Sequence, residues 1–276
     1  MKKVSGLMAA AALALALCAA ALASCKSEKK GGLWALLDEL KADYEWVDLS
    51  REVSPETVHW PGFDPLEVSV KYSFEDTYRD FGSNENNSFL AYLYTLPGQY
   101  GTHTDVPGHF DPAGRTTDRY GAKELAYPLV VVDKTAAVAA DPGYALTAQD
   151  LRDFEAAHGK IPAGAFVVFR SGWSKVAGKE ARYPGWDIGA LEFLVSERDV
   201  AGVGHETPDT DPSAVGESDV GMIGENYVLD HGKLNVELLQ NLDTLPVTGA
   251  VIFITFPLIK DGTGFTSRVF AIAPKG

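Results

Sequence analysis

Residues 98–110 concentrate the side chains best suited to chemistry, in the order Gly-Gln-Tyr-Gly-Thr-His-Thr-Asp-Val-Pro-Gly-His-Phe. Alternate residues of an extended strand project to one face, so His103 and Asp105 could bind one metal ion together, with Gln99 on the same face. Imidazole nitrogen with carboxylate oxygen suits Zn²⁺ or Mn²⁺ better than a soft metal or calcium. Spacing alone also allows a surface loop in which Asp105 caps a turn and the histidines, His103 and His109, are solvated.

This segment resembles the His-x-Gly-Thr-His-x-Asp-x-Pro-x-His signature of the metal-dependent cyclase family, which includes arylformamidases. The resemblance implies that His103 and Asp105 bind metal and that His109 is the catalytic acid and base. Gln99 stands in the place of the first histidine of the signature. An amide oxygen is a neutral and weaker ligand than imidazole, so the number of bound ions is expected to be one per chain.

The resemblance extends over most of the chain after residue 32. It implies that Glu237 binds metal, and that the residue twelve positions earlier does so as well. That residue is Glu225, where the formamidases have histidine. The segment Phe-Arg-Ser-Gly-Trp resembles one that lies near the substrate, which assigns Ser171 and Trp173 to substrate binding. Two other tryptophans could also line an apolar pocket, Trp60 and Trp186.

A further concentration of acid and imidazole occurs in residues 204–211, after a predicted strand. Loops after buried strands often hold functional residues, so His205 is a candidate for binding substrate or for acting through a ligand. The alternative is that His205 is a structural hydrogen-bond donor. Asp209 or Asp211 could cap the turn that follows.

The elements that must position these residues are short strands alternating with helices. Continuous apolar runs such as Leu129–Val132 are typical of buried strands covered by helices, which predicts an α/β domain. The resemblance implies a single swivelling β/β/α-type domain over residues 33–276, with a mixed sheet and flanking helices. Thr147 is a plausible N-cap and Gly159 a helix stop. We predict strands over residues 46–49, 66–72, 89–94, 129–133, 165–170, 200–203, 250–256 and 268–272, and helices over residues 33–44, 147–158, 188–197 and 234–242.

The N-terminal residues follow the layout of an export signal. Lys2 and Lys3 precede an uncharged apolar run that stops at Leu-Ala-Ser-Cys, so residues 1–24 read as a signal peptide. This pattern resembles a lipobox, which predicts lipidation of Cys25, a tether over residues 25–32 and anchoring to a membrane of the cell envelope. The alternative is an ordinary signal peptide with an accidental thiol at Cys25.

Composition excludes several classes of protein. The 276 residues are 46% hydrophobic and 22% charged, which argues against a disordered chain. A formal net charge of −14 argues against nucleic acid as a partner. After the signal segment, no apolar run reaches the ~20 residues of a membrane span. The resemblance implies a homo-oligomer.

Together these features predict a metal-dependent hydrolase of a small amide or lactam. One Zn²⁺ or Mn²⁺ would be held by His103, Asp105 and Glu237, with Gln99 and Glu225 completing its shell, and His109 would transfer the proton. Two alternatives remain open. One is serine hydrolysis through Ser171 or Ser267, although the chain lacks a Gly-x-Ser-x-Gly elbow; the other is a lipid-tethered, non-catalytic ligand-binding protein of the same fold.

Overall fold

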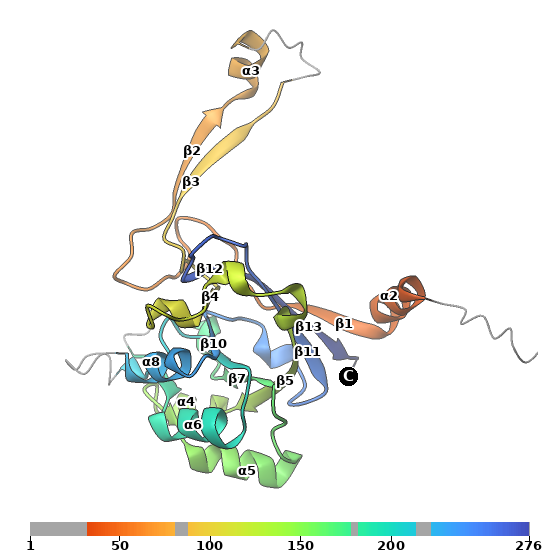
Figure 1. The fold of residues 1–276 in the computed structure, drawn as a ribbon, viewed down its shortest axis with the longest axis vertical. Coiled ribbons are helices and arrows are strands. Elements are labelled where there is room, and N and C mark those ends of the chain that lie inside the picture. The colour runs from red at the N-terminus through yellow and green to blue at the C-terminus, as the bar shows by residue number, and fades with distance from the viewer. Residues whose placement is uncertain (1–31, 81–87, 178–181, 214–221, 276) are drawn as a thin grey trace, which may run out of the picture. The chain divides into compact units, whose positions relative to one another are not determined.

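The computed structural model describes residues 32–80, 88–177, 182–213 and 222–275 (Figure 1). The chain divides into two compact units between Tyr44 and Glu45. Helix α2 (Leu33–Asp43) belongs to the first unit and confirms the helix predicted there. The predicted domain began at residue 33, whereas the second unit begins at Glu45. The predicted signal peptide and the lipidation site Cys25 lie outside the described residues.

A nine-stranded mixed sheet forms the centre of the second unit, in the order β1-β13-β11-β5-β7-β9-β10-β4-β12 (Figure 1). Strands β5, β7, β9 and β10 are parallel to their neighbours in this series, and β4 runs antiparallel to β10 and β12. The predicted α/β architecture with a mixed sheet and flanking helices is confirmed. The strands are β1 (Tyr44–Asp48), β4 (His103–Asp105), β5 (Ala126–Asp133), β7 (Phe166–Arg170), β9 (Gly202–His205), β10 (Leu234–Glu237), β11 (Ala250–Thr255), β12 (Gly264–Thr266) and β13 (Arg268–Pro274).

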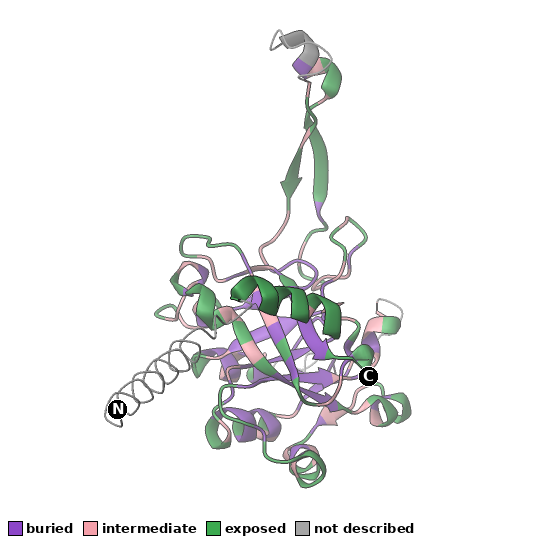
Figure 2. Ribbon diagram, turned by 90° about the vertical axis from the view of Figure 1, so that its right-hand side faces the viewer, coloured by how far each residue is buried: buried purple, intermediate pink, exposed green. Residues whose placement is uncertain are grey.

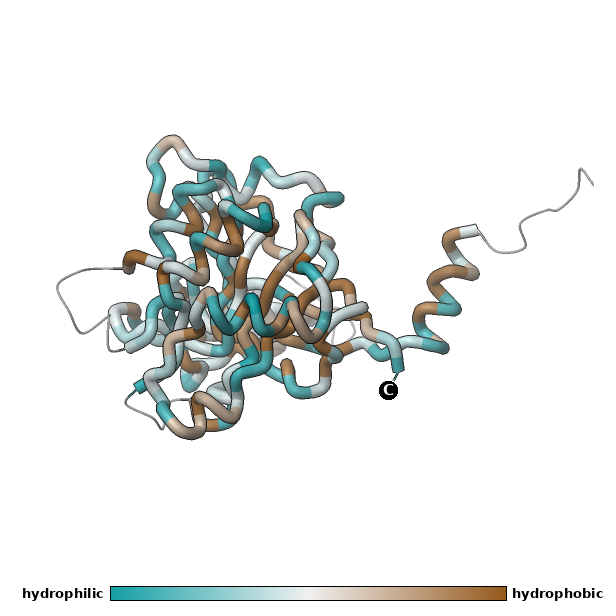
Figure 3. Tube along the Cα trace, turned by 90° about the horizontal axis from the view of Figure 1, so that it is seen from below, coloured by the Kyte–Doolittle hydropathy of each residue, from teal (hydrophilic) through white to brown (hydrophobic). Residues whose placement is uncertain are grey.

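The central strands are apolar on both faces, because both faces are covered. Alternate residues enter two separate clusters: Val131 and Val168 pack on one side, and Val130 and Val167 on the other. Much of the sheet is accordingly brown in Figure 3, which marks hydrophobic residues. The second cluster includes residues of four helices, which cover that face: α4 (Thr135–Ala140), α5 (Ala148–His158), α6 (Ile188–Glu192) and α8 (Ile223–Asp230).

Local sequence signals predicted both ends of α5 correctly. Thr147 caps α5 by accepting a hydrogen bond from the Asp150 amide, and Gly159 ends it with φ +90°. The helix predicted over residues 188–197 is α6 followed by a π-helical turn, Phe193–Glu197. Shorter elements are the paired strands β6 (Ala145–Leu146) and β8 (Gly185–Trp186) and the 3-10 turns Pro107–His109, Thr117–Arg119, Ala122–Leu125, Trp173–Lys175 and Leu242–Thr244.

The helix predicted over residues 234–242 is wrong. This segment begins as the buried strand β10, then turns through Leu238 and Asn241, whose φ angles are 56° and 59°. Leucines spaced at helical intervals suggested a helix, but Leu234 and Val236 alternate into the core from a strand held between β9 and β4. Pairing with distant strands overrides the local pattern. Helices α3, α4 and α8 were not predicted.

A separate two-stranded sheet pairs β2 (Glu67–Tyr72) with β3 (Ala91–Thr95), and helix α3 (Phe74–Asp80) follows β2. We call these three elements the arm. Both strands were predicted, and they pair antiparallel with each other. The strands of the arm are exposed along almost their whole length, in contrast to the central sheet (Figure 2).

Within the described residues, none of the helices combines the length and the hydropathy that crossing a membrane requires.

Candidate active site

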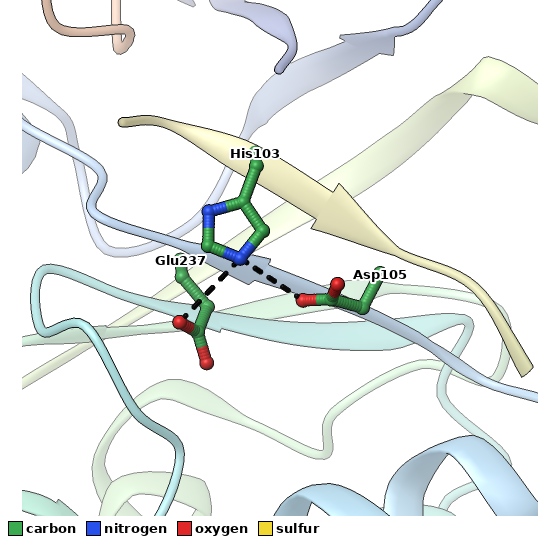
Figure 4. Close-up of side chains that lie close together, drawn as sticks. All are labelled: His103, Asp105 and Glu237. Atoms are coloured by element: carbon green, nitrogen blue, oxygen red, sulfur yellow. Dashed lines mark ion pairs between the residues drawn. The ribbon is translucent and has the colours of Figure 1, made fainter. Parts of the chain in front are cut away.

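Strands β4 and β10 bring distant residues onto one surface. In their antiparallel register Glu237 lies opposite His103, and Asn235 lies opposite Asp105. Directly opposed residues share a face of the sheet, so the side chains converge (Figure 4). Nε2 of His103 lies 3.3 Å from Oδ2 of Asp105 and 3.6 Å from Oε2 of Glu237. The Asn235 amide donates to Oε1 of Glu237 at 3.2 Å.

The ring of His103 is oriented by the backbone. Its Nδ1 bonds to the carbonyl oxygen of Gly101 at 2.8 Å, which turns Nε2 toward the two carboxylates. Burial by itself lowers the pKa of His103, but the charges of Asp105 and Glu237 outweigh it and raise the pKa to about 9. The imidazole is therefore held in a strongly negative environment.

Asp105 has the donor chemistry of a metal ligand. Its side chain is buried, and neither of its carboxylate oxygens accepts a hydrogen bond from any residue that the structure describes. Burying a carboxylate without donors is costly unless a cation or a charged partner compensates. Gly264 leaves room for this group, because a Cβ there would lie 2.8 Å from Oδ1 of Asp105 and 2.9 Å from Nε2 of Gln99. The pair of bare oxygens beside His103 fits a divalent cation.

His109 returns to the same place through the 3-10 turn Pro107–His109. Its Nε2 lies 4.0 Å from Oδ1 of Asp105, and its side chain is 30% exposed, unlike the buried His103. The amide nitrogen of Gln99 lies 3.4 Å from Nδ1 of His109 and also donates to Oγ1 of Thr263 at 3.4 Å. Gln99 is thus bonded to His109 and Thr263.

Glu225 enters from α8 and completes a second group. One nitrogen or oxygen atom from each of the side chains of Asp105, His109 and Glu225 lies within 4.8 Å of the other two. The same holds for His103, Asp105 and Glu237. Burial raises the pKa of Glu225 well above its usual range, and the charges of Glu237 and Asp105 add to this. Asp105 is common to both groups, so the two form one continuous set of candidate metal ligands.

Two aspartates of residues 204–211, Asp209 and Asp211, interact with residues of this set or with the helix that carries Glu225. Asp211 accepts hydrogen bonds from the Gly224 amide at 2.9 Å, and so caps the helix that carries Glu225. The prediction that one of the two aspartates caps the turn that follows is confirmed for Asp209, whose Oδ1 accepts a hydrogen bond from the Asp211 amide at 3.0 Å. Burial, with the charge of Glu237, raises the pKa of Asp209 to about 7. Buried acid exceeds buried base here, an imbalance that a bound cation would relieve.

A cavity of about 270 Å³ opens onto these side chains. Trp60 and Phe63 form one wall, with ring centroids 5.2 Å apart. From the sequence, Trp60 was considered for a pocket but not assigned to one, and Phe63 was not considered. The available signal was the segment Trp-Pro-Gly-Phe, residues 60–63, in which proline and glycine indicate a turn that carries both aromatic residues. The cavity is lined by Gln99, His103, His109, Asp209, Glu225 and Glu237 together with the apolar Trp60, Phe63, Phe110, Pro208 and Met222.

Ser171 and Trp173 are not brought to this cavity. They line a second one, also of about 270 Å³, beside α4. The Ser171 amide and hydroxyl both donate to Oε2 of the buried Glu206, each at 2.8 Å. The hydroxyl of Ser267 bonds to Thr104 and to the carbonyl of Phe265. Neither serine therefore shows a hydrogen bond to histidine within the described residues, the arrangement that serine hydrolysis needs.

His205 contacts Glu237 and does not line the cavity. It is 1% exposed, with Nε2 3.5 Å from Oε1 of Glu237. Trp186 donates its indole N–H to Nδ1 of His205 at 3.4 Å. His205 is thus placed to orient Glu237, and the three tryptophans considered from the sequence separate: Trp60 lines this cavity, Trp173 the other, and Trp186 holds His205.

Comparisons with known proteins show which family the sequence resembles. A family model with the description "Putative cyclase" matches residues 47–212, more than half of the chain. Isatin hydrolase of Roseibium aggregatum is 32% identical over 207 residues, which cover 70% of this chain and 78% of that protein. Kynurenine formamidase of Bacillus thuringiensis is 28% identical over 89 residues, which cover 32% of this chain and 38% of that protein.

A solved structure shows the same fold. Isatin hydrolase A from Labrenzia aggregata, bound to benzyl benzoate, matches with a TM-score of 0.77 and 27% identity. The match covers 88% of this chain and 99% of that one. The family model and the similarity to isatin hydrolase, together with the shared fold, lead to one conclusion: the chain belongs to the cyclase family.

Proposed function

We propose that the chain is a metal-dependent hydrolase that opens the amide bond of a small aryl amide or lactam. The observation that carries this proposal is the environment of Asp105, a buried carboxylate that has no hydrogen-bond donor among the described residues other than the imidazole of His103, whose Nε2 lies 3.3 Å from Oδ2. It lies in a set that also contains His103 and Glu237. The match to isatin hydrolase, which covers 70% of the chain, supports hydrolysis as the reaction class.

One divalent cation, Zn²⁺ or Mn²⁺, would be held by His103, Asp105 and Glu237. Glu225 borders the same position through Asp105, whereas Gln99 lines the cavity and bonds to His109. When bound, such a cation acts as a Lewis acid toward a carbonyl oxygen and lowers the pKa of water. The mixture of imidazole and carboxylate donors favours these ions over soft metals.

The walls of the cavity would orient the substrate. Trp60, Phe63 and Phe110 offer aromatic surface on which a flat ring can stack, opposite the polar floor. A volume of about 270 Å³ is at the small end of ligand pockets, which favours a single small molecule over a polymer. A compact bicyclic lactam such as isatin, or an aryl formamide such as N-formylkynurenine, combines a ring with a carbonyl that could face His103.

His109 would move the proton. Its side chain is partly exposed to the cavity, and Nε2 faces Asp105 at 4.0 Å. An imidazole can accept a proton from attacking water and pass it to the leaving nitrogen near neutral pH. Asp105 would stabilise the charged ring between those two transfers.

The location of the enzyme is a separate part of the proposal. The charged N-terminus, the apolar run and Cys25 support export and lipid anchoring in the cell envelope. Metabolic labelling with a radioactive fatty acid should mark the chain and should fail in Cys25→Ser. Labelling of that variant would contradict the assigned anchor.

Metal removal followed by assay tests the proposed reaction. Dialysis against EDTA should abolish hydrolysis of isatin or N-formylkynurenine, and Mn²⁺ or Zn²⁺ should restore it, while a serine-directed phosphonate has no effect. Asp105→Asn should lose both bound metal and activity, because it removes a charged ligand. The matched control Asp153→Asn changes an exposed carboxylate on α5 and should keep both. Full activity after complete metal removal, or full metal content in Asp105→Asn, would overturn the proposal.

A further inference from the structure

The aromatic wall of the active-site cavity is built on a tight turn. Trp60 and Phe63, which both line the cavity, are its ends, and the Phe63 amide donates to the carbonyl oxygen of Trp60 at 3.0 Å. The two central residues are Pro61 and Gly62. Proline fixes its own φ and restricts the backbone of the residue before it. The backbone that carries both rings is therefore held in one conformation.

Gly62 lies directly against the indole of Trp60. A Cβ at this position would overlap three carbons of the six-membered ring, far inside van der Waals contact. Gly62 does not belong to the glycines of positive φ, so alanine can adopt the same backbone conformation. What the position requires is room for the ring, and any side chain there would displace the indole.

The chain before the turn is anchored beside the cavity. The ring of His59 stacks on that of Tyr100, with centroids 4.8 Å apart, and the Tyr100 hydroxyl donates to the carbonyl oxygen of Ser54 at 2.9 Å. Tyr100 is fully buried, and it follows Gln99, which lines the cavity. Because this backbone is held in place, a clash with the indole of Trp60 has to be relieved by the ring itself.

We propose that Gly62 is a positioning residue that sets substrate specificity through Trp60. By admitting the indole against its backbone, Gly62 keeps that ring in the wall, at an angle of 65° to the ring of Phe63. A flat aromatic ring bound against this wall gains stacking contacts that a puckered saturated ring of the same size does not make. This role rests on the proposed function and narrows its substrate class to planar aryl amides and lactams.

The test compares two amides that differ only in the ring, formanilide and N-cyclohexylformamide, with the full metal-loaded chain. Gly62→Ala should raise the KM for formanilide about tenfold, because the stacking wall is displaced, and should leave kcat within about twofold. The preference for formanilide, as a ratio of kcat/KM, should fall with it, while metal content stays the same. Gly32→Ala is the matched control, because a Cβ there meets nothing within 4 Å, and it should keep the wild-type KM.

A double-mutant cycle separates positioning from a general effect on the fold. Trp60→Leu removes the indole, so adding Gly62→Ala to that variant should change the KM for formanilide by no more than about twofold. An equal effect of Gly62→Ala in both backgrounds would overturn the proposal, because Gly62 would then act on something other than Trp60.

Titration calorimetry with formanilide distinguishes failure of this role from failure of the proposed reaction. A wild type that binds formanilide about tenfold more tightly than Gly62→Ala does, but hydrolyses neither amide, would contradict the reaction and support the role of Gly62. Turnover with the same KM in the wild type and in Gly62→Ala would support the reaction and overturn the role of Gly62.

Discussion

The side-chain amide nitrogen of Gln99 lies 3.4 Å from Nδ1 of His109. This contact joins the Gln99 side chain to one nitrogen of the ring, so the hydrogen bond depends on which ring nitrogen carries the proton. An amide N–H can donate to a bare Nδ1 and an amide oxygen can accept from Nδ1–H, so Gln99 can bond to either tautomer. Gln99 is therefore positioned to control the protonation of His109.

Gln99→Leu is expected to change proton transfer more than metal binding. The substitution removes the amide beside Nδ1 while approximately keeping its volume, so the pH profile of kcat should shift and kcat should fall by about tenfold or more. Metal content, measured by mass spectrometry, should stay at one ion per chain. Gln99→His should raise Zn²⁺ affinity, because imidazole is the better donor. A parallel loss of metal and activity in Gln99→Leu would identify Gln99 as a ligand, and two tightly bound zinc ions in the wild type would contradict the single-ion prediction.

His109→Ala should remove most turnover and leave the metal bound. General acid–base catalysis typically contributes ~10²–10⁴-fold, so kcat should fall by that factor. His158→Ala provides a control, because that histidine ends α5 and does not line the cavity. Kinetics and metal content should be measured on the same samples. If metal content falls together with kcat, His109 is a ligand through the group that it forms with Asp105 and Glu225.

The metal-free chain should become less stable as pH rises from about 4 to about 9. Folded Asp209 keeps its proton up to a pKa of about 7, whereas the unfolded side chain loses it near 3.8. Folded His103 keeps its proton up to about 9, compared with 6.5 when unfolded. In both windows the unfolded state binds fewer protons, so the free energy of unfolding decreases with rising pH.

Thermal unfolding at a series of pH values, after EDTA treatment, checks this expectation. Asp209→Asn should flatten the dependence between pH 4 and 7 and leave the part due to His103. Added Mn²⁺ should raise the Tm more at pH 8 than at pH 5, because the ligands must be deprotonated to bind it. Stability that stays constant or increases from pH 5 to pH 8 in the metal-free chain would contradict the raised pKa values of Asp209 and His103.

Glu206→Gln should destabilise the fold. The buried carboxylate accepts hydrogen bonds from the Ser171 amide and hydroxyl at 2.8 Å, the Gly172 amide at 2.5 Å and the Ser174 hydroxyl. An amide would turn its own donors toward some of these, which should cost about 2–4 kcal/mol. Urea titration gives the free energy of unfolding. Glu192→Gln, an exposed change on α6, should stay within about 0.5 kcal/mol of the wild type.

Much of the fold could be predicted because the relevant signals are local. The apolar run of β5 predicts a strand buried on both faces, and Thr147 and Gly159 mark the ends of α5. The segment of residues 234–242 could not be predicted in this way. Its leucines have helical spacing, and only the hydrogen bonds that β10 makes with β4 and β9 hold it extended.

The sequence by itself determined that His103 and Asp105 share a face, because alternation along a strand is a property of the backbone. Only the tertiary structure decided that Glu237 lies opposite His103, and that Trp60 lines the cavity whereas Trp173 lines another. Residues far apart in the chain meet through strand order and register, which depend on the packing of the whole sheet. No local pattern of residue types contains that information.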